Sequence, residues 1–544
     1  MRHAIVSSKF LSSKNASSKE APSLSDALAA DAKWLKCNPP QLDAVDANSL
    51  KDILPNAEFF SGDDVKFTGI ADNVQSAQPG DLVVYRIGEC DPMELAATAM
   101  ARGAAGIVTE QMLPCPLPQC IVGDVELAMA KIASGLLGRP DHKLLTIGVV
   151  GSAGKTTTSL LISSLLRGGG TRTAYQTDLG DCDGIVQSTP STTLPTGCNL
   201  VQWLGEAVDG QCQAAVIELA DQDARHGKYD AMQFDILVIT GTAPLSSDFG
   251  PSGLQCLLEH IKPTGVVVAP IDDERGIQVV RDSGCRMVTY GMKRRADLNG
   301  KIVESSCGMS TMSITEGDTT ALLETALCGA ANAANHLAAA SVGMLIDQPL
   351  QQVVQSLSSL RAVPARGQRL SDFQHATAIL DVAGTPERAS AAMHTARSMK
   401  AGGQLWCVLA INENDSPETL AHYGQLLERY SNKAIVTCPR SMKASFLSAT
   451  HHLLDGVQHC AAMRLVADPQ RAVAWAVSEA KPSDTILVLG GVDTSNAHQQ
   501  RTDIQELKGW VDTQREMNEA VAKSTGNEVE LRNPSILPIR AFKN

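Results

Sequence analysis

The chain has 544 residues, too many for one hydrophobic core, and this length predicts about three domains. Its formal net charge of −13 at pH 7 argues against nucleic acid or an anionic membrane as a partner, because either would need a basic face. No apolar stretch reaches the ~18 residues that cross a bilayer, and fourteen cysteines without a C-x-x-C pair suit a reducing compartment. We therefore expect a cytoplasmic protein with no membrane insertion.

The predicted elements begin after an N-terminal arm. Residues 1–23 are rich in Ser and Lys and contain no long apolar segment, which predicts a disordered arm rather than a secretory signal. Residues 24–143 follow with a turn and strand at 80–85, a helix at 92–102 and a second strand at 105–109. This alternation predicts a small α/β domain.

Residues 144–362 predict a larger domain that begins with an apolar strand. Helical stretches then alternate with further apolar strands, at residues 214–217, 234–240, 265–270 and 287–290. The pattern is typical of a mainly parallel sheet with helices on both faces. Ligands of such sheets bind beyond the carboxyl ends of the strands.

Residues 363–500 repeat the alternation and predict another α/β domain. The strands expected there cover residues 378–380, 405–409, 434–437 and 485–489. The C-terminal residues, 501–544, hold one amphipathic helix and a Pro-containing tail, to which we assign no function.

The most informative segment, Gly-Ser-Ala-Gly-Lys-Thr-Thr, directly follows the first strand of the central domain. Gly151 and Gly154 would let backbone N–H groups converge on phosphate oxygens, and Lys155 adds a positive charge. Thr156 can bind Mg²⁺ at the start of a helix, and Thr157 continues the run of hydroxyls. The segment therefore predicts a phosphate-binding loop.

The spacing departs from the strict motif, which has a glycine where this chain has Val149. The alternative interpretation is a strand-to-helix turn with two glycines and a surface lysine. The buried strand predicted at 144–150 and the amphipathic helix predicted at 159–166 favour the phosphate loop, because the motif requires this context.

Three α/β domains in this order, with the phosphate loop opening the second, resemble the Mur ligases, and further segments are similar to the MurE branch. The similar segments are PGDL at 79–82, GAAGIV at 103–108, the phosphate loop, STTLP at 191–195, GAANAAN at 329–335, VPAR at 363–366 and LDVAGTP at 380–386. Several weak motifs in the family's order are stronger evidence for the resemblance than any one of them alone.

The resemblance implies a three-domain α/β fold with a central P-loop sheet and a Rossmann-like C-terminal domain. It implies a monomeric ligase that uses ATP and Mg²⁺ to add an amino acid to UDP-N-acetylmuramoyl-dipeptide in peptidoglycan synthesis. The acceptor carboxylate would attack the γ-phosphate to give an acyl phosphate, and the incoming amine would then displace phosphate. Nucleic acid is not an expected partner.

The resemblance also implies roles for individual residues. Lys155 and Glu218 would be catalytic, and Thr156 with Glu218 would hold Mg²⁺. Glu218 follows the strand at 214–217, where a metal-holding carboxylate should project; the alternative is a carboxylate that caps the next helix. The residues expected to contact ATP are Gly151, Gly154, Lys155, Thr156, Thr157, Asn332, Asn335, Arg366 and Asp381.

Two further segments would bind the other substrates. Ser191, Thr192 and Thr193 resemble the Ser/Thr-rich segment that holds the UDP-sugar peptide. Arg440, in Cys-Pro-Arg, is what remains of the family's D-N-P-R signature for meso-diaminopimelate. It could bind a carboxylate of the amino acid, although a solvated arginine is an equally good interpretation.

Several catalytic residues of the family are replaced. Leu254 stands in place of a lysine that is carbamylated in the family, and Gly384 in place of a histidine. The family's S-S-H after the glutamate has become Ala-Asp-Gln, and the histidine expected after the next strand is missing near Ser246. If two such supports of the metal site were each worth about 3 kcal/mol, their loss would slow ligation by roughly four decades.

These departures leave three hypotheses open. The first is an active ligase whose second metal site has been rebuilt, with Asp221 or Asp248 as a substitute ligand. The second is a catalytically degenerate paralogue that binds ATP or the UDP-sugar peptide and has a regulatory or scaffold role. The third is a P-loop ATPase unrelated to the cell wall. This hypothesis leaves the resemblance of the first and third domains unexplained.

Overall fold

The computed structural model describes residues 48–188, 194–242, 252–306, 309–370, 376–382, 384–399, 402–459, 462–493 and 497–531. These residues form two compact units that separate near Arg361. The first unit contains the small N-terminal sheet and the large central sheet, and the second contains the C-terminal sheet. The expected α/β fold class is confirmed, whereas the domain boundaries remain predictions.

The N-terminal sheet has five strands in the order β2-β7-β6-β5-β4, parallel except for β2 against β7. Its strands are β2 (Glu58–Phe60), β4 (Gly69–Ala71), β5 (Asp81–Tyr85), β6 (Gly106–Thr109) and β7 (Gln119–Ile121), with a separate pair β1 (Asn48–Ser49) and β3 (Lys66–Phe67). Its helices are α2 (Leu50–Ile53), α3 (Pro92–Ala101) and α4 (Val125–Leu136). Helix α3 begins where the sequence predicts, because Asp91 accepts hydrogen bonds from the first-turn amides and Pro92 suits the first position.

The central sheet has eleven strands in the order β11-β10-β9-β12-β8-β13-β14-β15-β16-β17-β18. Its predicted strands are present as β8 (Leu145–Val150), β12 (Ala214–Glu218), β13 (Phe234–Ile239), β14 (Ile261–Pro270) and β15 (Met287–Gly291). The others are β9 (Thr173–Thr177), β10 (Gly180–Cys182), β11 (Gln187–Ser188), β16 (Leu298–Ser306), β17 (Met309–Glu316) and β18 (Thr319–Thr325). The run β9-β12-β8-β13-β14-β15-β16 is parallel throughout, so the carboxyl ends of these strands share one edge, whereas β10 pairs antiparallel with β9 and with β11.

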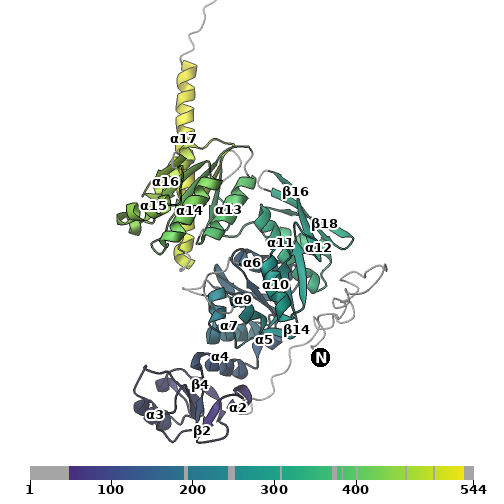
Figure 1. Ribbon diagram of the computed structural model, residues 1–544, viewed down its shortest axis with the longest axis vertical. Helices are drawn as coiled ribbons and strands as arrows, with labels where there is room; N and C mark the ends of the chain where they lie inside the picture. Colours follow the sequence, from purple (N-terminus) through teal and green to yellow (C-terminus); the bar gives the residue numbers. More distant parts are fainter. Residues whose placement is uncertain are drawn as a thin grey trace, which may run out of the picture. The chain divides into compact units, whose positions relative to one another are not determined.

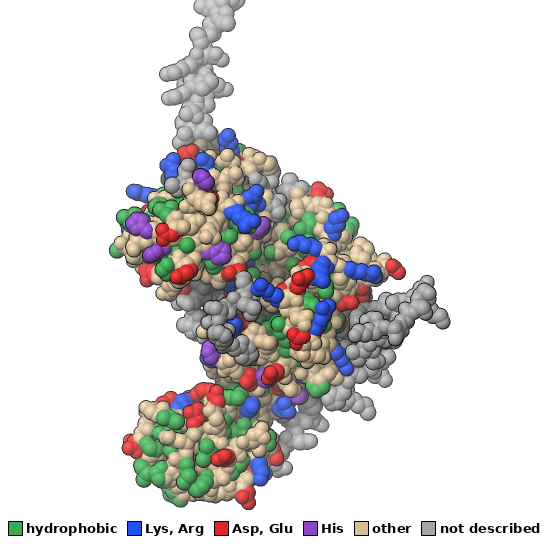
Figure 2. Space-filling view, in the orientation of Figure 1, with side chains coloured by type: hydrophobic (Ala, Val, Ile, Leu, Met, Phe, Trp, Pro, Cys, Tyr) green, Lys and Arg blue, Asp and Glu red, His purple; other side chains and the backbone are tan. Residues whose placement is uncertain are grey.

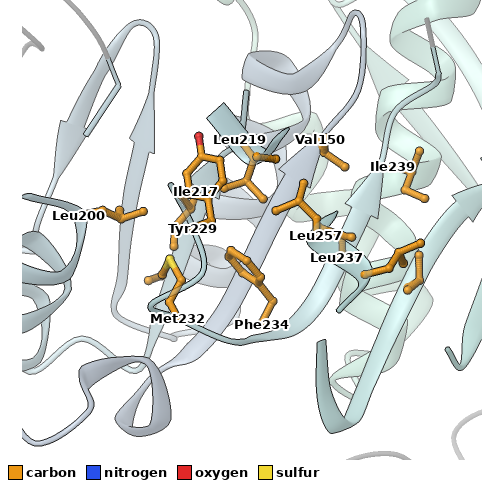
Figure 3. Close-up of a cluster of buried hydrophobic side chains, with 14 of the residues drawn as sticks. Val150, Leu200, Ile217, Leu219, Tyr229, Met232, Phe234, Leu237, Ile239 and Leu257 are labelled. Atoms are coloured by element: carbon orange, nitrogen blue, oxygen red, sulfur yellow. The ribbon is translucent and has the colours of Figure 1, made fainter. Parts of the chain in front are cut away.

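Helices surround the central sheet (Figure 1). They are α5 (Pro140–Lys143), α6 (Lys155–Gly168), α7 (Gly197–Asp209), α8 (Asp221–Arg225), α9 (Gly253–Leu258), α10 (Glu274–Ser283), α11 (Ala330–Leu345) and α12 (Leu350–Ser358). On one face the strands pack against α7 and α9 in an apolar core that includes Tyr229, Phe234, Leu237 and Leu257 (Figure 3). Strand β8 is buried at every position, which explains its continuous apolar sequence.

The C-terminal sheet has six strands in the order β19-β20-β24-β21-β22-β23, parallel except for β19 against β20. Its strands are β19 (Gln368–Arg369), β20 (Thr377–Asp381), β21 (Leu405–Ala410), β22 (Lys433–Thr437), β23 (Met463–Leu465) and β24 (Thr485–Leu489). Its helices are α13 (Pro386–Met399), α14 (Pro417–Tyr430), α15 (Phe446–Leu454), α16 (Pro469–Glu479) and α17 (Ala497–Leu531), with 3₁₀ turns η3 (Val74–Ser76) in the first unit and η4 (Arg440–Ala444) here. Leu507 and Val511 of α17 are buried in one of its cores, as the amphipathic pattern indicated.

The surface of the part with the N-terminal sheet shows several exposed apolar side chains, visible in green in Figure 2. Phe60, Ile87, Met93, Met100 and Met112 are each about half exposed. Acidic and basic side chains are intermixed on the face that Figure 2 shows. Within the described part of the chain, no helix combines the length and apolar character needed to cross a membrane.

Candidate nucleotide and metal site

The loop between β8 and α6 has a shape that only glycine accommodates at two positions. Gly151 has φ +149°, and a Cβ there would collide with the Thr240 hydroxyl and lie 2.8 Å from the Gly241 carbonyl. Gly154 has φ +85°, and a Cβ there would collide with the carboxamide oxygen of Asn335. The two glycines thus allow close approach of neighbouring groups, as a phosphate loop requires.

The end of β13 holds this loop in place. The Thr240 hydroxyl donates to the Ala153 carbonyl at 2.6 Å, and the Ser152 amide donates to the Gly241 carbonyl at 3.1 Å. The loop lies where β8 ends between β12 and β13, at the carboxyl edge of the parallel strands. This edge is where ligands of parallel α/β sheets bind.

Charged and hydroxyl groups converge at the start of α6. Lys155 Nζ lies 3.8 Å from Glu218 Oε1, and the Thr156 hydroxyl donates toward the same oxygen at 3.3 Å. Glu218 is the last residue of β12 and is only 2% exposed. The Thr156 hydroxyl also donates to Asp178 Oδ1 at 2.9 Å, and the Asp178 amide donates to Glu218 Oε2 at 3.2 Å.

These groups fit Mg²⁺, which prefers oxygen ligands and is usually held by one or two carboxylates together with substrate phosphates. A hydroxyl and a buried carboxylate supply such donors, beside a lysine able to meet phosphate oxygens. Among the described residues, no group of three or more His, Cys, Asp or Glu side chains is gathered as a self-sufficient metal cage. The remaining ligands would therefore come from phosphate and water.

Asp178 was not identified from the sequence, although a signal exists. It directly follows β9, and β9 runs parallel to β12 in register with Gln176 opposite Ile217. The residues after these two strand ends therefore reach the same edge of the sheet. An acidic residue directly after a parallel strand that neighbours the glutamate strand would have indicated Asp178.

The structure also brings Asn332 and Asn335 to the site. Both lie in the first turns of α11, which packs against α6. Asn335 touches Gly154, and its amide donates to Asn332 Oδ1 at 3.4 Å. The Asn332 amide in turn donates to the Cys328 carbonyl at 2.9 Å. The two asparagines are thus in place to border a nucleotide bound at the loop.

His336, which the sequence analysis did not single out, fixes the segment before α11. Its Nδ1 donates to the Asn332 carbonyl at 2.7 Å, so its Nε2 accepts the Thr325 hydroxyl at 3.2 Å. The Thr325 hydroxyl accepts the Leu327 amide at 3.0 Å. His336 is fully buried, and this burial lowers its pKa to about 4.

We expect His336 to make the first unit less stable in acid. Its pKa is about 6.5 when unfolded and about 4 when folded, so the unfolded chain binds the proton first. The free energy of unfolding is unaffected by this group above pH 6.5 and falls as the pH drops toward 4. At pH 4 the loss of stability amounts to about 3 kcal/mol. Urea unfolding of the wild type and of His336→Gln at pH 7 and pH 4 measures the difference. Equal pH dependence of the two proteins would contradict the prediction.

Gly154→Ala is expected to weaken nucleotide binding at least about tenfold. Alanine at φ +85° costs about 1 kcal/mol, and its methyl group must also displace Asn335 from the loop. Gly170→Ala is a matched control, since Gly170 also has φ +85° and nothing lies within 4 Å of the added Cβ. Titration with ATP should show the loss only for Gly154→Ala; equal affinities in both variants would refute the contact.

Two of the residues expected to contact ATP lie in the second unit and form their own cluster. Asp381 ends β20, and its Oδ2 accepts the Gly367 amide at 2.7 Å. Burial raises the pKa of Asp381 to about 7, against the opposing charges of Arg366 and Arg388. Arg366 also donates to the Ala365 carbonyl at 3.2 Å.

The remaining expectations have mixed outcomes. Thr157 is buried in the first turn of α6, and Arg440 is exposed at the start of η4. Ser191, Thr192 and Thr193 lie outside the described residues, as does Asp248. Asp221 accepts from Arg225 Nε at 2.9 Å, which gives its carboxylate a structural partner.

Leu254, which stands where the resemblance implies a lysine, is part of the apolar core. Leu254 lies in α9, is 5% exposed, and belongs to the same cluster as Tyr229 and Leu257. Lys262, the nearest lysine along the chain, pairs with Asp235 at 2.7 Å. Both residues stand near the amino ends of their strands, at the sheet edge opposite the loop. Lys262 therefore does not replace the missing lysine.

The fold and the loop together define an α/β protein of the phosphate-loop type. Comparison with protein families gives a more specific result: the Mur ligase middle domain matches residues 149–343, and the Mur ligase glutamate ligase domain matches residues 365–492. Together the two matches span more than half of the chain. The chain therefore belongs to the Mur ligase family.

Individual relatives agree with this assignment. A UDP-N-acetylmuramoyl-L-alanyl-D-glutamate--2,6-diaminopimelate ligase of Geobacillus kaustophilus is 25% identical over 417 residues, 74% of this chain and 84% of the relative. The ligase of the same name from Streptomyces coelicolor is 26% identical over 516 residues, 90% of this chain and 99% of the relative. The alignment thus extends well beyond the two family domains.

Solved structures show the same fold. The structure of a UDP-N-acetylmuramoyl-L-alanyl-D-glutamate--2,6-diaminopimelate ligase has a TM-score of 0.62 at 20% identity, covering 86% of this chain and all of that one. The MurF ligase of Thermotoga maritima in complex with ADP has a TM-score of 0.57 at 18% identity, covering 82% and 98%. At 18–20% identity, these two structures show a likeness of fold alone.

Proposed function

We propose that this chain is an ATP-dependent amide ligase of the MurE type, which adds an amino acid to UDP-N-acetylmuramoyl-dipeptide. The observation that carries the proposal is the convergence of Lys155, Thr156 and Glu218 at the carboxyl edge of the central sheet, in a chain of the Mur ligase family. The relatives' names supply the substrate class. A cytoplasmic location, a monomeric state and the use of Mg²⁺ are parts of this proposal.

The residues of the site suit the first chemical step. Transfer of a γ-phosphoryl group to a carboxylate brings two anions together, so the site must offset their repulsion. Bound Mg²⁺ would neutralise charge on the phosphates. Lys155 offers its ammonium group at the start of α6, where helix amides also favour anions. Thr156 and Glu218 would hold the metal, and Asn335 would keep the loop in shape.

The second step joins the amine of the amino acid to the activated carboxyl group and releases phosphate. Arg440 is the residue proposed to bind the amino acid's carboxylate; its exposed position leaves the guanidinium accessible. Because the polar D-N pair of the family's D-N-P-R signature is absent before Pro439 and Arg440, the proposal does not fix the amino acid. Arg366 and Asp381 are proposed to contact ATP from the second unit.

One observation favours a second candidate, a nucleotide-binding protein without ligase turnover. Leu254 fills a core position where the resemblance implies a metal-orienting carbamylated lysine, and a leucine offers no ligand. Loss of this support would slow ligation while leaving the groups around the phosphate loop intact. The two candidates therefore differ in turnover rather than in nucleotide binding.

The deciding experiment measures ADP formation by the purified protein with Mg²⁺ and ATP. UDP-N-acetylmuramoyl-dipeptide is added alone and with each amino acid of a panel that includes diaminopimelate. Turnover that requires both the acceptor and one amino acid would establish the ligase and identify its substrate. ATP binding without such turnover would overturn the ligase proposal and favour the binding protein.

A further inference from the structure

Asp178 places a second carboxylate beside the hydroxyl that the phosphate loop offers to a metal. Its Oδ1 lies 2.9 Å from Thr156 Oγ1, closer than Glu218 Oε1 at 3.3 Å. Its amide donates to the other oxygen of Glu218 at 3.2 Å. The three residues come from α6, β12 and the end of β9, so the fold rather than one local motif brings them together.

The Thr177 side chain makes hydrogen bonds within the turn that contains Asp178. The Thr177 hydroxyl accepts the Leu179 amide at 3.3 Å and donates to the Gly180 carbonyl at 2.9 Å. Thr177 therefore closes this turn, while the Asp178 carboxylate is directed to Thr156. A purely local role in the turn does not account for the position of this carboxylate.

The charges around Thr156 favour a divalent cation. A threonine hydroxyl has one proton and can donate it fully to only one of two carboxylates, while its oxygen keeps lone pairs for a metal. Asp178 and Glu218 bring two negative charges, and Lys155 brings one positive charge at 3.8 Å from Glu218. Phosphates bound at the loop would add more negative charge. A cation of charge +2 would offset this excess, and two carboxylates with phosphate oxygens match the preference of Mg²⁺.

We propose that Asp178 is a metal-site residue of this chain, supplying a second carboxylate for the Mg²⁺ that Thr156 and Glu218 hold with a bound nucleotide. The inference rests on the nucleotide site of the proposed function, but it does not require ligase turnover. It is separate from the hypothesis of Asp221 as substitute ligand, which stays a prediction; the Asp221 carboxylate accepts from Arg225 Nε at 2.9 Å. Leu254, where the resemblance implies a carbamylated lysine, offers no metal ligand and lies in the apolar core.

The test measures metal affinity directly, with Mn²⁺ as the probe and ADP as the nucleotide. Electron paramagnetic resonance of free Mn²⁺ gives its affinity for the protein–ADP complex. Asp178→Asn removes the charge but keeps an oxygen that can accept from Thr156, so it separates metal binding from a simple hydrogen bond. Mn²⁺ affinity should fall about tenfold or more in this variant, and Asp178→Glu should recover part of it.

Asp209→Asn is the control for net charge. Asp209 is exposed at the end of α7, before the amino end of β12, so it lies at the sheet edge opposite the loop. This variant should bind Mn²⁺ as the wild type does. Thermal unfolding followed by circular dichroism checks that each variant is folded when its Mn²⁺ affinity is compared with that of the wild type.

Each outcome decides the inference. Wild-type Mn²⁺ affinity in folded Asp178→Asn would overturn it and leave Asp178 as a hydrogen-bond partner of Thr156. Failure of the wild type to bind Mn²⁺ with ADP would overturn both this inference and the nucleotide site. Weaker metal binding in Asp178→Asn, in a protein that shows no ligase turnover, would support the inference while the ligase proposal fails.

Discussion

Lys155→Met is expected to lower ATP-dependent turnover by roughly 10²–10³-fold, because it removes the positive charge that we propose to face the transferred phosphoryl group. Methionine keeps most of the aliphatic stem of lysine, so the change is mainly one of charge. Lys155 Nζ lies 3.8 Å from the buried Glu218, and its side chain is 11% exposed. ATP affinity should fall as well, by at least about tenfold. ADP formation and calorimetric titration with ATP measure the two effects.

Lys262→Met is a closely matched control for this change. The Lys262 side chain is also 11% exposed and also pairs with a carboxylate, Asp235, but at the opposite edge of the same sheet. Both substitutions leave a carboxylate without its lysine, so both should lower the free energy of unfolding. Only Lys155→Met should lower ATP affinity. Retained affinity in Lys155→Met, or equal losses in the two variants, would refute a specific role of Lys155 at phosphate.

Leu254→Lys, which introduces the lysine that the family resemblance implies at this position, is expected to destabilise the first unit by several kcal/mol rather than to raise ligase turnover. Leu254 is 5% exposed and belongs to the same apolar cluster as Leu257, which Figure 3 labels. An ammonium group among these apolar side chains would lose its water, and burial of a charge in an apolar core is among the costliest single changes. Urea unfolding measures the loss.

Leu254→Met is the companion variant, since it keeps the volume and apolar character of leucine. It should cost less than about 1.5 kcal/mol. If Leu254→Lys were as stable as Leu254→Met and also raised ADP formation, the site around α9 would still accept the family's metal-orienting group. That result would contradict the expectation that the core around Leu254 excludes a charged group.

The elements that follow from local sequence were predicted well. Strand β8 has an uninterrupted apolar sequence because both of its faces are buried, and α3 begins at an aspartate followed by proline. The antiparallel pair β17 and β18 was missed, although its burial alternates and Gly317, with φ +52°, lies in the turn between the strands. These signals were present but were not used.

The sequence by itself determined the α/β class, the phosphate loop and the position of Glu218 at a strand end, because each depends on residues adjacent in the chain. Only the tertiary structure revealed that the Asp178 carboxylate meets Thr156, that His336 binds Thr325 and the Asn332 carbonyl, and that Leu254 belongs to the core. These residues are brought to their neighbours by the parallel order of the strands and by the packing of α9 and α11. Strand order depends on contacts between residues far apart in the sequence, and no local pattern of residues specifies it.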